Sequence, residues 1–150
     1  MEIGKIMEKV PELEDAVLDH IAIAVQSIET SLSIYEDLGF KFQEKREVVE
    51  EQGVKTAFAR IDQTAHLELL EPTHDKSPIY QFIDRKGQGI HHICVQVRDV
   101  KKKTEELKNK GYRMIYDHPM TGAGGHMVNF IHPKSTGGVL IEISQKVAVN

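Results

Sequence analysis

Two histidines and two glutamates recur at matching places in the two halves of this 150-residue chain. His20 in "LDHIAIAV" and His92 in "IHHICVQV" are offset by 72 positions (92 − 20), and Glu68 and Glu142 by 74 (142 − 68). Two neutral imidazoles and two carboxylates form a nitrogen and oxygen donor set whose two negative charges balance a divalent cation. Zinc, cobalt, nickel, manganese and iron all suit this set. Four protein ligands leave open positions on an octahedral ion, which favours a catalytic metal over a structural one.

The alternation of side chains along a strand predicts how these residues are presented. Successive side chains of a strand point to opposite faces of its sheet. In all four segments apolar residues take one face, so we expect four side chains on the other, concave face: His20, Glu68, His92 and Glu142. Alternation also places Asp19 and His91 on the apolar faces. We therefore expect His92 to be the ligand, and His91 to be a packing or hydrogen-bonding residue.

The repeat extends beyond the ligands and predicts the fold. Ser27 and Asp99 are suitable N-cap residues, and Gly39 and Gly111 suit the left-handed position after a helix. Each half begins with a strand, a helix ended by glycine and a second strand. Two more strands follow, at 53–61 and 65–72 in the first half and at 126–133 and 138–144 in the second. We expect a single α+β domain over 1–150, in which two βαβββ modules with pseudo-twofold symmetry form a curved mixed sheet. The modules span about 17–73 and 88–146, joined by a linking helix at about 77–87.

Composition and charge narrow the classes of partner. The chain is 28% charged and 40% hydrophobic with a formal net charge of −4, and it has no basic stripe, so we expect no nucleic-acid partner. No apolar run reaches membrane-spanning length, and charges interrupt the first 16 residues, where a short helix up to Pro11 is predicted. A single cysteine, Cys94, excludes an intramolecular disulfide and is expected to pack as a small hydrophobe. These features predict a cytoplasmic protein.

Five stretches carry a resemblance to a known family. The chain resembles the vicinal oxygen chelate (glyoxalase/bleomycin resistance/dioxygenase) superfamily and, within it, the methylmalonyl-CoA epimerase family. The stretches are "LDHIAIAV", "EQGVKTAFARI", "LELLEP", "SPIYQFIDRKGQGIHHICVQVRDV" and "GAGGHMVNFIHPKSTGGVLIEIS", from Leu18 to Ser144. The paired His–Glu positions belong to the superfamily as a whole, whereas "SPI…F…GIHHI" and "HPKSTGGVLIE" look like the epimerases in particular.

The resemblance implies an activity, a cofactor and partners. It implies inversion of a 2-methylmalonyl thioester at C2 through an enolate, with an acyl-CoA substrate, one divalent ion such as cobalt, zinc, nickel or manganese, and a homodimer. Glu142 resembles the base on one face of the intermediate. Some members carry a second base just after the Gly-Val of the second strand, but Thr56 occupies that position here. Glu50, Glu51 and a metal-bound water remain open as alternatives, so the second acid/base group is unassigned.

Three other functions fit parts of the pattern. A lactoylglutathione lyase of the glyoxalase I type can use the same four ligands, although the tail of the chain reads more like an epimerase. Extradiol dioxygenases use two histidines and one carboxylate, so the fourth candidate ligand argues against them. A non-catalytic small-ligand-binding module of the same fold would not need four intact ligand positions.

Overall fold

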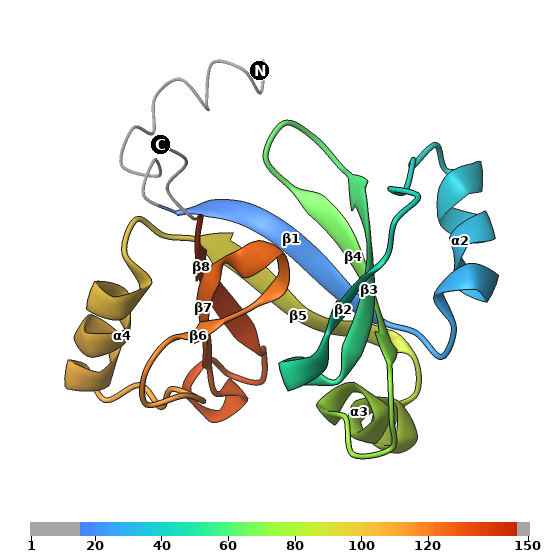
Figure 1. Cartoon of the computed structure of the whole chain (residues 1–150). Coiled ribbons are helices and arrows are strands. Elements are labelled where there is room, and N and C mark those ends of the chain that lie inside the picture. The colour runs from blue at the N-terminus through green and yellow to red at the C-terminus, as the bar shows by residue number, and fades with distance from the viewer. Residues whose placement is uncertain (1–15, 147–150) are drawn as a thin grey trace.

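The computed structural model describes residues 16–146 of the chain. In this part of the chain eight strands form a single curled mixed sheet and three α-helices pack around it (Figure 1). The elements in chain order are β1 Val17–Ala24, α2 Ile28–Asp37, β2 Glu47–Val49, β3 Val54–Arg60, β4 His66–Pro72, α3 Pro78–Lys86, β5 Gly89–Gln96, α4 Val100–Asn109, β6 Met120–Thr121, β7 Met127–Ile131 and β8 Ile141–Gln145. The helix predicted before Pro11 lies outside the described residues.

The order of the strands confirms the two predicted βαβββ modules. The sheet runs β2-β3-β4-β1-β5-β8-β7-β6. The first strands of the two modules, β1 and β5, pair antiparallel at its centre, and each pairs in parallel with the last strand of its own module, β4 or β8. A pseudo-twofold axis therefore passes between β1 and β5, and the four candidate ligands lie on the four strands nearest to it.

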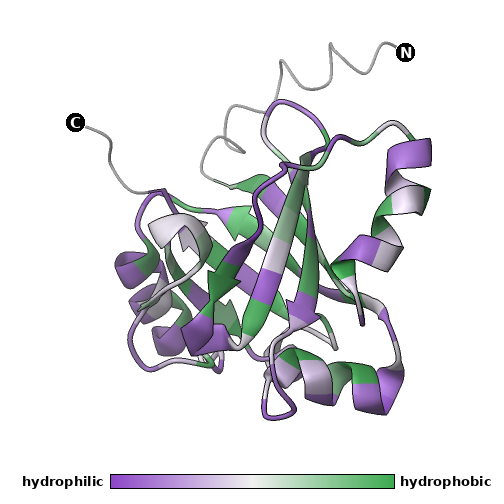
Figure 2. Ribbon diagram, turned by 45° about the vertical axis from the view of Figure 1, so that its right-hand side comes forward, coloured by the Kyte–Doolittle hydropathy of each residue, from purple (hydrophilic) through white to green (hydrophobic). Residues whose placement is uncertain are grey.

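Local sequence signals set where the helices begin and end. The side chains of Ser27 and Asp99 accept backbone N–H bonds at the starts of α2 and α4, as predicted. Gly39 and Gly111 follow these helices with φ of 103° and 92°, a conformation that costs glycine little. Figure 2 shows hydrophobic residues along the strands and hydrophilic residues over much of the helices. No helix in the described part of the chain is long and apolar enough to cross a membrane.

The helices cover different faces of the sheet. Helix α2 buries Ile28 against Ala57 and Leu69 on the outer face of the first module. Linking helix α3, capped by Ser77 as predicted, instead packs Ile79 against Ala22 and the neighbouring apolar side chains. Because Ala22 is two residues from His20 on the same strand face, α3 closes one end of the concave face.

Three predicted strand positions are wrong. The strand expected directly after each helix is reduced to a single bridge, at Phe42 in one module and Met114 in the other, and the paired strands β2 and β6 begin later. Strand β8 begins at Ile141 rather than at 138. The backbone N–H of Val139 donates to the hydroxyl of Thr136, which holds the chain in a turn until the ladder begins.

The expected faces of Asp19 and His91 are also wrong, because both residues form β-bulges. The pairing of β1 with β5 slips by one residue between Leu18 and His20, which leaves Asp19 as the extra residue on β1. It slips again between Ala22 and Ile23, which leaves His91 as the extra residue on β5. A bulge interrupts the strict alternation of faces. Both side chains therefore line the same cavity as the histidines that follow them.

Candidate metal centre

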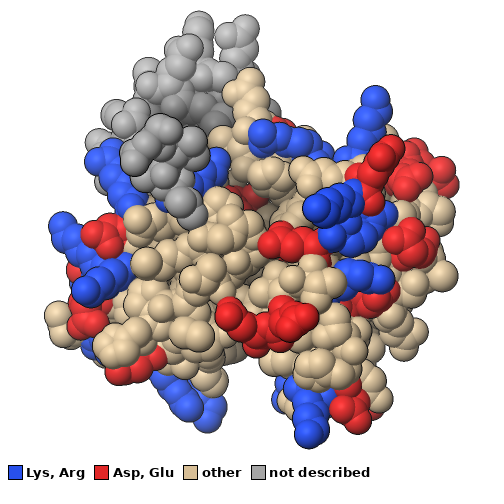
Figure 3. Space-filling model, viewed as in Figure 1, with Lys and Arg blue, Asp and Glu red and all other residues tan. Residues whose placement is uncertain are grey.

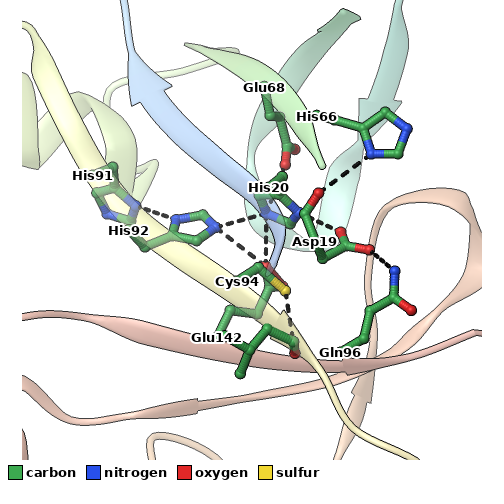
Figure 4. Close-up of polar contacts among 10 residues, drawn as sticks. Asp19, His20, His66, Glu68, His91, His92, Cys94, Gln96 and Glu142 are labelled. Atoms are coloured by element: carbon green, nitrogen blue, oxygen red, sulfur yellow. Dashed lines mark hydrogen bonds and ion pairs between the residues drawn. The ribbon is translucent and has the colours of Figure 1, made fainter. Parts of the chain in front are cut away.

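The four predicted donors come together on the concave face (Figure 4). Strands β1, β4, β5 and β8 each contribute one side chain, and all four are buried, with exposed fractions of 8% for His20, 4% for Glu68, 6% for His92 and 6% for Glu142. Buried carboxylates are costly unless they are paired or bind a cation. Two of them in one place indicate a site that is built for positive charge.

The distances between donor atoms suit a single cation. Nε2 of His20 lies 2.9 Å from Oε2 of Glu68, 3.0 Å from Oε1 of Glu142 and 3.2 Å from Nε2 of His92. Metal–ligand bonds of about 2.1 Å at right angles separate neighbouring donors by about 3 Å. The donor atoms of His20, His92 and Glu142 all lie within 4.8 Å of one another, and Glu68 contacts His20. Three donors are therefore assembled, with Glu68 beside them.

The charges of the cluster depend on one another. Burial disfavours a charged ring at His20, but Glu68, together with hydrogen bonds to Asp19 and Glu142, raises the His20 pKa above its ordinary value. Burial likewise disfavours the Glu142 carboxylate, but the two histidines beside it lower its pKa. A proton on His20 thus offsets the buried carboxylates in the metal-free protein. The same charge balance would favour a divalent ion.

Cys94 lies beside this centre. Its side chain is fully buried, two residues from His92 on the same strand, and together with Asp19 and His20 it forms a second group of potential donors. Burial raises the pKa of the Cys94 thiol to about 12 in the metal-free protein. The four predicted donors themselves offer only nitrogen and oxygen atoms. Because Cys94 is two residues from His92 on β5, alternation puts both side chains on the same face of the sheet.

A cavity of about 530 Å³ opens over the cluster, within the range of small-molecule sites. Both modules line it, with Phe58 from the first module and Phe130 from the second among its apolar walls. Figure 3 shows acidic side chains near the middle of the face that it views. Glu47 and Glu51 are among the acidic residues that line the cavity. Oε1 of Glu47 accepts a 3.0 Å hydrogen bond from the backbone N–H of Gly124, which ties the two modules together at the rim.

The position of the second base in some epimerases is closed off here. Thr56 is 1% exposed, and its hydroxyl donates to the backbone carbonyl of Glu47 at 3.3 Å. It is not among the residues that line the cavity. Any further acidic or basic group in this part of the cavity would have to come from another element.

Comparisons with known proteins agree on the family and on the type of relative. The model of the glyoxalase/bleomycin resistance protein/dioxygenase superfamily matches residues 19–130. A methylmalonyl-CoA epimerase of Dictyostelium discoideum is 40% identical over 131 residues, which are 86% of this chain and 78% of the relative. An ethylmalonyl-CoA/methylmalonyl-CoA epimerase of Cereibacter sphaeroides is 36% identical over 131 residues, 85% of this chain and 96% of the relative.

The solved structures point the same way. A Streptomyces coelicolor methylmalonyl-CoA epimerase variant in complex with 2-nitronate-propionyl-CoA superposes with a TM-score of 0.84. It is 36% identical in sequence, and the match covers 89% of this chain and 96% of the other. The fold, the four converging donors and these matches lead to one conclusion: the chain belongs to the glyoxalase/bleomycin resistance protein/dioxygenase superfamily.

Proposed function

We propose that this protein is a methylmalonyl-CoA epimerase that inverts C2 of its substrate with the help of one divalent metal ion. One observation supports this most strongly: two buried histidines and two buried glutamates, two of them supplied by each module, form the floor of a cavity large enough for an acyl group. Several relatives that share most of the chain carry the names of enzymes acting on methylmalonyl-CoA. The metal, its ligands and the enolate are part of the proposal.

The chemistry fits the residues. The C2 proton of a methylmalonyl thioester lies between a thioester and a carboxylate, so its removal gives an enolate. A divalent cation held by the four ligands would stabilise the negative charge that develops on the substrate oxygens. The chain itself supplies a water-poor floor and apolar walls around the acyl group, which strengthen that stabilisation.

Proton transfer at C2 needs one group on each side of the flat enolate. We assign Glu142 on β8 to one side. Its pseudo-twofold counterpart is Glu68 on β4, and the two strands flank the central β1–β5 pair from opposite sides. Both carboxylates reach Nε2 of His20, at 3.0 Å and 2.9 Å. We therefore propose that Glu68 takes the second role, which Thr56 cannot perform here.

A chiral assay of the wild-type protein tests the proposed function. One C2 epimer of methylmalonyl-CoA is supplied to protein reloaded with cobalt, zinc, nickel or manganese, and the appearance of the other epimer is followed. The hemithioacetal of methylglyoxal and glutathione serves as the competing substrate. Epimerisation without turnover of the hemithioacetal supports the proposal. The reverse result, or turnover of neither substrate, contradicts it.

The proposal extends to the assembly of the protein. The family resemblance predicts a homodimer, and sedimentation at micromolar concentration tests it. A purely monomeric protein that epimerises the substrate would contradict this part alone.

A further inference from the structure

The residue before each candidate ligand histidine occupies the same unusual position in both modules. Asp19 precedes His20 on β1, and His91 precedes His92 on β5, with the same offset of 72 positions (91 − 19). Each of the two is the extra residue of a β-bulge, and each lines the cavity. The bulges are therefore a paired feature of the fold, and not an irregularity of one strand.

The side chain of each bulge residue contacts Nδ1 of the histidine that follows it. Oδ2 of Asp19 lies 2.7 Å from Nδ1 of His20, and Nδ1 of His91 lies 2.8 Å from Nδ1 of His92 (Figure 4). Both Nδ1 atoms are thus engaged, while the two Nε2 atoms face each other across the centre at 3.2 Å. The bulges therefore determine which nitrogen each ring presents.

Further contacts hold the bulged side chains in place. The side-chain amide of Gln96 donates to Oδ1 of Asp19 at 2.6 Å, so both carboxylate oxygens of Asp19 are used. The ring of His91 packs edge-to-face on Phe82 of α3, with the centroids 4.9 Å apart. Strand β5 thereby supports the ring of His20 through Gln96 and Asp19, and helix α3 supports the ring of His92 through His91.

An imidazole that binds a metal through Nε2 carries its hydrogen on Nδ1, and the partner of that N–H fixes the tautomer and the orientation of the ring. Asp19 is an acceptor for His20, and Nδ1 of His91 is an acceptor for His92 when the hydrogen of His91 is on Nε2. With uninterrupted alternation, both partners would lie on the opposite face of the sheet. The two bulges bring them to the face where they are needed.

We propose that Asp19 and His91 are positioning residues, which hold His20 and His92 with Nε2 directed at one metal ion. The inference rests on the proposed metal centre, but it does not depend on which substrate is turned over. The two contacts differ in strength. The negative carboxylate of Asp19 makes His20 the stronger metal donor, whereas His91 offers only a neutral acceptor to His92.

Three variants separate positioning from packing. Asp19→Ala removes the acceptor, and Asp19→Asn keeps an oxygen in the same place without its charge. His91→Phe keeps a ring against Phe82 but removes the nitrogen that contacts His92. Glu71→Gln is the matched control, because Glu71 is a half-buried carboxylate that binds Lys55 and the N-terminus of α2 outside the cavity.

The measurements are the affinity for Co²⁺, by competition with a chelator, and the visible absorption of the cobalt-loaded protein. Thermal unfolding of the metal-free proteins identifies any variant that fails to fold. We expect Asp19→Ala and His91→Phe to lose roughly 10- to 100-fold in affinity and to show altered cobalt absorption. Asp19→Asn should lose less than Asp19→Ala, and Glu71→Gln should match the wild type.

Folded Asp19→Ala and His91→Phe proteins with wild-type affinity and absorption would overturn the inference. Unchanged metal binding in only one of them would overturn the role of that residue. If the wild type epimerises methylmalonyl-CoA but binds no Co²⁺, the inference fails while the proposed activity stands. If it binds Co²⁺ as described but turns over no methylmalonyl-CoA, the activity fails while the positioning role stands.

Discussion

Replacing Glu142 by Gln should separate metal binding from proton transfer. The side chain keeps its size and one oxygen in a site that is 6% exposed, so the fold should tolerate the change. Oε1 of Glu142 lies 3.0 Å from Nε2 of His20 and 3.2 Å from Nε2 of His92, so an amide oxygen in this place remains a candidate ligand. The glutamine cannot accept the C2 proton. We therefore expect a variant that retains part of its metal and loses its base.

General-base catalysis contributes roughly 10²- to 10⁴-fold in rate, and 10²-fold corresponds to about 2.7 kcal/mol of barrier. We therefore expect exchange of the C2 proton to slow by on the order of 10²-fold or more in the metal-loaded Glu142→Gln protein. Incorporation of deuterium from D₂O into methylmalonyl-CoA, followed by mass spectrometry, measures it, with metal content determined on the same sample. Glu71→Gln should exchange at the wild-type rate. Near wild-type exchange in metal-loaded Glu142→Gln would refute the assigned role, and Glu51 would be examined next.

Three further substitutions test the ligand set, a buried hydrogen-bond cluster and the pH dependence of stability. His92→Ala should lose bound metal and C2 exchange together while remaining folded, and a variant that keeps its metal by elemental analysis would remove His92 from the ligand set. Asn129→Leu should lower the free energy of unfolding, measured in urea, by roughly 3 kcal/mol. The substitution leaves the buried hydroxyl of Thr104 and the backbone groups of Tyr116 without their hydrogen-bond partner. A loss below about 1 kcal/mol would contradict this. Burial and the neighbouring His92 lower the pKa of His91 from 6.5 to about 3, so the folded protein keeps this ring neutral at neutral pH. The contribution of His91 to stability is therefore present above pH 6.5 and is lost as the pH falls towards 3. The melting temperature of the metal-free protein should therefore fall less between pH 7.5 and pH 5 in His91→Phe than in the wild type, and equal falls would contradict this.

The repeat made the fold predictable. Each module must bury the same pattern of apolar residues, so one offset of 72 positions between His20 and His92 already implies two similar units. Helix starts were predictable because capping is local: Ser27 and Asp99 accept bonds from backbone groups three residues ahead. The second strand of each module was expected directly after the helix, whereas β2 and β6 begin later, because strands of three and two residues carry too little periodicity to be located.

The site was predictable only as far as alternation holds. Alternation placed the four donors on one face, and the structure brings them together there. It misplaced Asp19 and His91, because a bulge is set by the pairing of two strands and not by the order of residues in one. The doublets Asp19-His20 and His91-His92 contain the only available hint. In both modules a polar residue falls where the apolar alternation calls for a hydrophobic one.

The most direct test of the central claim is exchange of the C2 proton of methylmalonyl-CoA by the wild-type protein, stripped of metal and then reloaded. Mass spectrometry in D₂O gives the rate in both states. We expect little exchange by the stripped protein and recovery when one equivalent of divalent ion is returned, because His20, Glu68, His92 and Glu142 together form the proposed site. Rapid exchange by the stripped protein, or none after reloading, would contradict it.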